Sequence, residues 1–159
     1  MSQVSVQSIE KAIEKIDSLN DEALDKLIET FTLKQEQLVS YLLQAGVEYE
    51  NEELNVFSIY YFAIVLEAFL NEGLQLKEIS EEDIDNFQDP FLLALDAIHK
   101  EEDYEPMQDL TRQHHLMQFM MHEIEAADED GEVLDEETKL QLFIVSSGMI
   151  GLMNQAITK

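Results

Sequence analysis

The sequence predicts an all-α fold, a single domain spanning residues 1–159 and built as a bundle of six or seven helices. Three observations support this. Hydrophobic residues make up 45% of the chain, which is more than a disordered acidic protein carries. Only two Pro and five Gly occur, although these residues punctuate the turns of sheet-rich folds. Apolar residues recur at helical spacing, and 159 residues suit one domain.

The first two helices are expected at residues 5–19 and 21–45. In the first, four apolar residues share one face: Val6, Ile9, Ile13 and Ile16. Asn20 is a good N-cap and opens the second helix, whose apolar residues follow steps of four and three from Leu24. Gly46 then stands where helices commonly end.

A third helix is expected at residues 56–73. Its apolar run, 56–70, contains 15 residues and includes Glu67, whereas a membrane span needs about 20 apolar residues. We therefore expect a buried core helix and no membrane association. Glu67 is expected to share a water-facing polar stripe with Tyr60 and Asn71; in the other interpretation it is buried and needs a partner.

Three further helices are expected between residues 80 and 124. Ser80 caps a short helix, and Asp89 with Pro90 restarts the chain because Asp caps helices and Pro suits their first turn. Pro106 opens the next helix, which carries one continuous stripe from Met107 through His114 to Ile124.

The last helix runs from about Glu136 to the C-terminus and is apolar nearly all round, so it must be buried. Ser147, Gly148 and Gly151 give it a face of small side chains, although glycine costs about 1 kcal/mol relative to alanine in a helix. Either a neighbouring helix of the same chain or a second copy approaches this face closely. A homodimer through this helix, or through the Met-rich helix after Pro106, is one prediction.

An internal repeat is suggested by laying residues 61–73 over residues 119–131 without a gap. Both segments end in an acidic residue and a glycine, and an acidic helix start follows each. This match predicts two related helical hairpins.

The formal net charge of -26 comes from 35 carboxylates against nine bases. Such a chain repels phosphate backbones and anionic lipid surfaces, so we expect no nucleic-acid binding, and any charged partner is expected to be a cationic protein surface or a metal ion. Salt adaptation gives a similar charge balance, but the many large apolar residues argue against it. The absence of cysteine excludes disulfides and thiolate sites. No signal segment is recognised at the N-terminus, which favours a cytoplasmic location.

The acidic turn at residues 128–137 carries the most specific motif. If Gly131 takes the sharp-turn position of a calcium-binding EF-hand loop, Asp128 and Asp130 fall on ligand positions and Glu137 on the closing bidentate one. Ala126 then occupies the first ligand position, where a carboxylate is usual. This motif predicts binding of calcium or another divalent cation.

Residues 119–140 also resemble the acidic helical turn of the TerB-like tellurite-resistance family. The turn of that family has the form Asp-Gly-x-hydrophobic with a downstream Glu, which Asp130, Gly131, Val133 and Glu136 or Glu137 match here. The resemblance implies a small all-helical protein that binds divalent ions, with Asp128, Asp130 and Glu137 as ligands. In the alternative interpretation the turn is solvated, and its carboxylates stabilise the positive N-terminus of the last helix.

A carboxylate-histidine metal site is a further hypothesis. Asp96 with His99, and His122 with Glu125, each have a spacing of three on a helix, and Glu67 is available from the central helix. His115 and His122 lie about 10.5 Å apart on one helix, which is too far for one ion. In the opposite interpretation these pairs are ordinary helix-surface residues.

No motif for nucleotide binding or nucleophilic catalysis is present, which favours a non-enzymatic protein and no cofactor. The leading hypothesis is an interaction protein, such as an inhibitor, immunity or adaptor protein, whose acidic surface binds a basic partner. The alternatives are a TerB-like divalent-cation-binding protein and, third, a carboxylate-histidine metalloenzyme.

Overall fold

The computed structural model describes residues 2–126 and 130–158. Within these residues the chain is all-helical, as predicted, but it forms eight helices rather than six or seven. The helices are α1 (Val6–Ser18), α2 (Asp21–Lys34), α3 (Glu36–Glu48), α4 (Glu52–Asn71), α5 (Glu81–Glu101), α6 (Glu105–Thr111), α7 (His114–Glu125) and α8 (Glu136–Gln155). A single antiparallel bridge joins Leu76 to Ile157.

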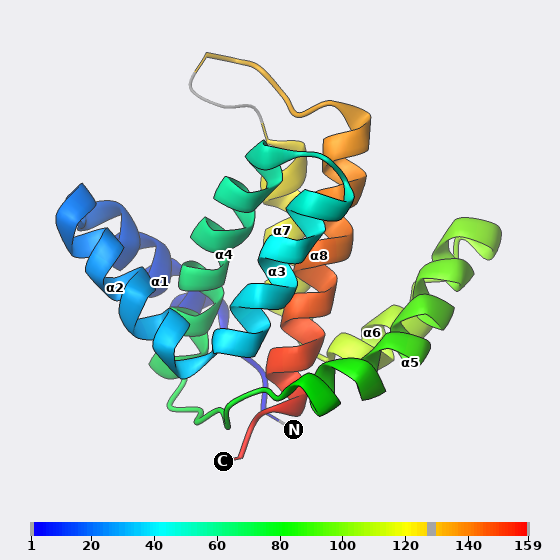
Figure 1. Cartoon of the computed structure of the whole chain (residues 1–159), viewed down its shortest axis with the longest axis horizontal. Helices are drawn as coiled ribbons and strands as arrows, with labels where there is room; N and C mark the ends of the chain where they lie inside the picture. The colour runs from blue at the N-terminus through cyan, green and yellow to red at the C-terminus, as the bar shows by residue number, and fades with distance from the viewer. Residues whose placement is uncertain (1, 127–129, 159) are drawn as a thin grey trace.

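Helices α4 and α8 form the centre of the molecule (Figure 1). Helix α4 packs against α1, α2, α3 and α8, and α8 packs against α3 to α7. Both helices bury side chains on nearly every side, as expected for α8. Helix α4 has 20 residues, longer than the apolar run suggested, because Asn51 caps it four residues earlier than expected. By length and composition it is able to span a membrane, but 61% of its apolar window is buried inside the protein.

The prediction of one helix over residues 21–45 is wrong, because the helix is interrupted at Gln35 and the segment forms α2 and α3. This residue has φ -138° and ψ 52°, outside the helical region, and its buried side chain bonds to the segment before α5. The apolar spacing continues across the break, so periodicity gave no sign of it. Gly46 lies inside α3 rather than at its end, and the Asn55 side chain packs directly on it.

The predicted stripe from Met107 to Ile124 is also interrupted. Arg112 adopts the left-handed conformation with φ 55°, and α7 begins two residues later at His114. Helix α7 buries Leu116 and Met120, which lie outside the predicted stripe, together with Ile124, which belongs to it. His114 is exposed instead of buried.

Helix α5 is one continuous helix, whereas two were expected at this position. Ser80 forms the predicted N-cap, and with Asp83 it completes a capping box. Pro90 lies inside the helix rather than in a first turn. An interior proline removes one backbone donor, and burial of Phe87 and Phe91 on either side holds the helix together across it.

The eight helices fall into two units with the same order of elements. Each unit starts with a short extended segment that ends in a serine N-cap, Ser5 or Ser80. In the first unit α1 and α2 are followed by Gln35, α3 and α4, and in the second α5 and α6 are followed by Gln113, α7 and α8. Both glutamines have non-helical backbone angles, and the last helix of each unit has 20 residues. The structure therefore matches α4 with α8, not with α7 as the overlay of residues 61–73 on 119–131 predicted.

Each glutamine holds the extended segment of the opposite unit. Gln113 accepts a hydrogen bond from the Val4 backbone nitrogen at 2.9 Å and donates one to the Ser2 carbonyl at 2.8 Å. Gln35 binds residues 77–79 with the same pattern. The two units are thus tied together reciprocally, through two amides that are both buried.

Candidate functional site

The candidate site is a groove of about 500 Å³ between α3 and α5. Helix α3 supplies one wall and α5 the other, while Ile144 and Val145 of α8 contribute to its lining. In Figure 1, α5 diverges from the central helices toward its C-terminal end. It packs against α6 and α8 but has no extensive contact with α3 among the described residues. The groove is therefore open along its length.

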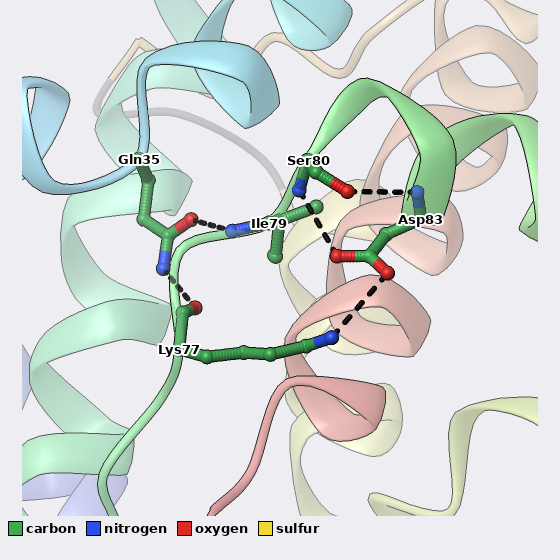
Figure 2. A network of polar contacts seen from close by, with 5 residues as sticks. All are labelled: Gln35, Lys77, Ile79, Ser80 and Asp83. Atoms are coloured by element: carbon green, nitrogen blue, oxygen red, sulfur yellow. Dashed lines mark hydrogen bonds and ion pairs between the residues drawn. The ribbon is translucent and has the colours of Figure 1, made fainter.

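One polar network fixes the end of the groove where both walls begin (Figure 2). Gln35, immediately before α3, accepts a hydrogen bond from the Ile79 nitrogen and donates one to the Lys77 carbonyl, both at 2.9 Å. Ser80 and Asp83 cap α5 at 3.0 and 3.1 Å, and Lys77 lies 3.3 Å from the Asp83 carboxylate. The start of α5 is thereby anchored to the start of α3.

The Asp83 carboxylate is held in its charged form by this network. The backbone N–H of Ser80 is the main cause of its lowered pKa, and the Ser80 hydroxyl and Lys77 act in the same direction. A hydrogen-bonded anion at a helix N-terminus also opposes the positive end of the helix dipole. The position of α5 is therefore stabilised by a charged cap.

The groove combines an apolar lining with an acidic rim. The aliphatic and phenylalanine side chains that line it belong to seven residues: Ala45, Ile84, Phe91, Leu92, Leu95, Ile144 and Val145. Glu48, Glu81 and Asp85 stand among the lining residues and are exposed, and neither Lys nor Arg is among them. In the printed sequence, residues 35–76 and 78–99 contain neither Lys nor Arg. The lining of the groove therefore carries three carboxylates and no basic residue.

Tyr41 lies at the bottom of the groove against Gly148. A Cβ carbon added to that glycine would stand 2.6 Å from the Tyr41 hydroxyl oxygen. Burial raises the pKa of Tyr41 to about 12, and neighbouring Tyr49 and Glu48 contribute in the same direction. Tyr41 is thus a neutral hydroxyl at physiological pH.

The small-residue face of α8 packs against other helices of the same chain. Ser147, Gly148 and Gly151 are all buried, with Gly148 against Tyr41 and Gly151 against the ring of Phe87. This is the intramolecular close approach that the sequence left as one of two alternatives. A homodimer stays a prediction, and Met121 of α7 and Leu140 of α8 are the exposed apolar residues on the two helices named for it.

The acidic turn lies partly outside the described residues, because Asp128 is among residues 127–129. Asp130 and Glu137 are both exposed, and Gln141 donates a hydrogen bond to Glu137 at 3.3 Å. Asp135 caps α8 by accepting from the Thr138 nitrogen at 2.7 Å. Part of the acidic turn thus stabilises a helix start, and binding of calcium or another divalent cation there stays a prediction.

The residues of the carboxylate-histidine hypothesis are only partly brought together. Asp96, His99 and Glu125 line a second groove, on the α7 side of α5, of about 460 Å³. His122 and Glu67 do not line it. Within residues 2–126 and 130–158, no group of three or more His, Asp or Glu side chains is close enough to hold a metal ion.

Glu67 is buried, with 4% of its surface exposed, so the water-facing interpretation is wrong for this residue and the alternative of a buried acid is confirmed. It forms an ion pair with Lys15 of α1, although its Oε1 atom makes no hydrogen bond of ordinary geometry. We regard the ion pair as the relevant interaction, because a buried carboxylate needs a counter-charge. Glu67 therefore joins α1 to α4.

Comparison of the chain with family models, with curated proteins and with solved structures gives no match. The residues of the α3–α5 groove were not singled out from the sequence. One signal was present: the adjacent apolar residues Leu92 and Leu93, which are both exposed. The long stretches without Lys or Arg are a second signal.

Proposed function

We propose that this protein is a non-enzymatic interaction protein, of the inhibitor, immunity or adaptor kind, whose α3–α5 groove binds a basic protein partner. The observation that carries the proposal is the combination of apolar lining and acidic rim without a basic residue in the groove. Charge of one sign around a partly apolar depression attracts a cationic surface and gives it apolar area to bury.

The overall charge supports the same partner class. A net charge of -26 speeds the approach of cationic proteins and repels nucleic acid and anionic membranes. The groove adds a place on which such a partner can be fixed. Tyr41 and the exposed carboxylates offer no arrangement of nucleophile and base, which is consistent with a binding role rather than catalysis.

The proposal is tested with a fluorescent lysine-rich peptide titrated against the full chain at low and high salt. Glu48→Gln with Asp85→Asn removes two groove charges, and Asp25→Asn with Glu29→Gln removes two exposed charges from α2. Both variants change net charge equally. We expect the peptide to bind at low salt and to dissociate at high salt. The double variant in the groove should weaken this binding several-fold more than the double variant on α2. Equal losses in the two variants, or no binding at low salt, would contradict the proposal.

A further inference from the structure

The two units of the chain provide an internal comparison for α5. Counted from their serine caps, α1 and α5 have two buried positions in common, so that Ala12 corresponds to Phe87 and Ile16 to Phe91. Each of the two helices packs on the long central helix of its own unit, α1 on α4 and α5 on α8. The first part of α5 thus has the structural role that α1 has.

Beyond these positions the two helices differ. Helix α1 has 13 residues and ends at Ser18, whereas α5 has 21 and continues to Glu101. Where α1 carries the exposed polar residues Asp17 and Ser18, α5 carries Leu92 and Leu93, which are 55% and 70% exposed. The first unit folds without an extension or surface leucines at this place. The extension packs on α6 and on the core through Ala94 and Ile98, but Leu92 and Leu93 do not, so these two side chains are available for contact outside the chain.

The apolar residues on the groove side of α5 follow helical spacing. Ile84, Phe91, Leu92 and Leu95 lie on one side of the helix and line the groove with Ile144 of α8. The lining of α5 extends from Glu81 to Leu95, which at 1.5 Å per residue is about 21 Å long. A groove of this length and character suits the apolar face of a helix of about four turns.

We propose that the partner of the α3–α5 groove contributes a cationic amphipathic helix, whose apolar face packs on Leu92, Leu95 and Ile144 and whose Lys or Arg side chains reach Glu48, Glu81 and Asp85. This inference rests on the proposed function and specifies the occupant. Acids stand on both walls, Glu48 on α3 and the other two on α5, so the basic residues flank the apolar stripe on both sides.

The test uses two peptides of identical composition, made of Leu, Lys and Ala, with about 14 residues each. One has its leucines on a single helical face, and its isomer has the same residues scrambled. We expect the amphipathic peptide to bind about tenfold more tightly, because only it buries several leucines together, and to gain helical circular dichroism on binding.

A matched pair of variants locates the contact. Leu92→Ala removes an exposed leucine from the groove, and Leu33→Ala removes one that is 65% exposed on α2. We expect Leu92→Ala to weaken binding of the amphipathic peptide several-fold and Leu33→Ala to leave its affinity unchanged. Equal effects of the two variants would overturn the assignment of the contact to α5.

The outcomes separate this inference from the function on which it rests. If both peptides bind equally and both are weakened by Glu48→Gln with Asp85→Asn, the helical occupant is wrong and the basic-partner function stands. If neither peptide binds at low salt, both proposals fail.

Discussion

Gly151 of α8 lies so close to Phe87 of α5 that a Cβ carbon on the glycine would stand 2.6 Å from the aromatic ring. Carbon atoms in van der Waals contact are separated by about 3.5–4.0 Å. The glycine therefore sets how closely α5 approaches the central helix, and with it the position of one groove wall. The cost of placing a glycine inside α8 is offset by the packing of the buried Phe87 side chain against it.

Gly151→Ala is expected to lower the free energy of unfolding by about 1–2 kcal/mol. Overpacking a core costs about 1–3 kcal/mol, and the gain in helix propensity returns up to about 1 kcal/mol. Urea unfolding followed by circular dichroism measures the change. In a double-mutant cycle with Phe87→Leu, we expect the double variant to lose less stability than the sum of the single variants. A Gly151→Ala protein as stable as the wild type would mean that Phe87 moves freely.

Those parts of the fold that depend on local signals were predictable from the sequence. Asn20 and Ser80 cap helices because their short polar side chains reach backbone N–H groups three residues on. The apolar character of residues 56–70 and 140–153 identified the two central helices. These signals arise within one turn or one helix, so they can be recognised without knowledge of the tertiary structure.

The helix breaks at Gln35 and Gln113 were not predictable in this way. Each break is compensated by hydrogen bonds to an extended segment far away in the sequence, and apolar spacing runs across both. Pro90 was misread because an Asp-Pro pair suits a helix start equally well. The groove depends on the divergence of α5 from α3, a tertiary feature, whereas the acidity of its rim follows from composition.

Gln35→Ala is expected to lower the free energy of unfolding by about 2–4 kcal/mol. The substitution leaves the buried Ile79 N–H and the Lys77 carbonyl without partners, at about 1–3 kcal/mol for each buried group. Urea unfolding measures the change, with Gln118→Ala, an exposed glutamine on α7, as the control. A loss no larger than that of the control would show that water replaces the amide.

The reciprocal ties predict a specific pattern of hydrogen exchange. Gln113→Ala should speed exchange of the Val4 amide about tenfold or more and leave the Ile79 amide protected, since Gln113 binds the segment before α1 whereas Gln35 binds the segment before α5. Gln35→Ala should do the opposite. Each variant is the control for the other, and exchange that accelerates equally in both segments would indicate general loosening of the protein.

Glu72 is expected to make stability depend on pH in the acid range. The backbone N–H of Ser5 at 2.7 Å is the main cause that lowers the pKa of Glu72 below its ordinary value of 4.5, and the hydroxyls of Ser5 and Ser8 add to it. The unfolded chain therefore binds this proton more tightly than the folded one. The stabilisation is complete above pH 4.5 and is lost as pH falls through the lowered pKa.

Glu72→Gln is the variant that checks this dependence. At neutral pH we expect it to be less stable than the wild type by about 1 kcal/mol, a value reduced for the partial exposure of the carboxylate. The difference should shrink as the pH falls below 4.5, as measured by urea unfolding at each pH. Glu22→Gln, an exposed change on α2, should give no such trend. A difference that is constant with pH would contradict the role of the charge.

Lys15→Ala is expected to lower the free energy of unfolding by about 1–2 kcal/mol, because it leaves the buried carboxylate of Glu67 without its counter-charge. The cost stays below that of a fully buried pair, since the Lys15 side chain is half-exposed and water reaches it. Lys11→Ala removes an exposed lysine from the same helix and should change stability little. The decisive measurement is the double variant Lys15→Ala/Glu67→Gln, which should regain part of the loss because no unpaired charge remains buried. If the double variant is instead as unstable as the sum of the single changes, Glu67 stabilises the α1–α4 contact by packing rather than by its charge.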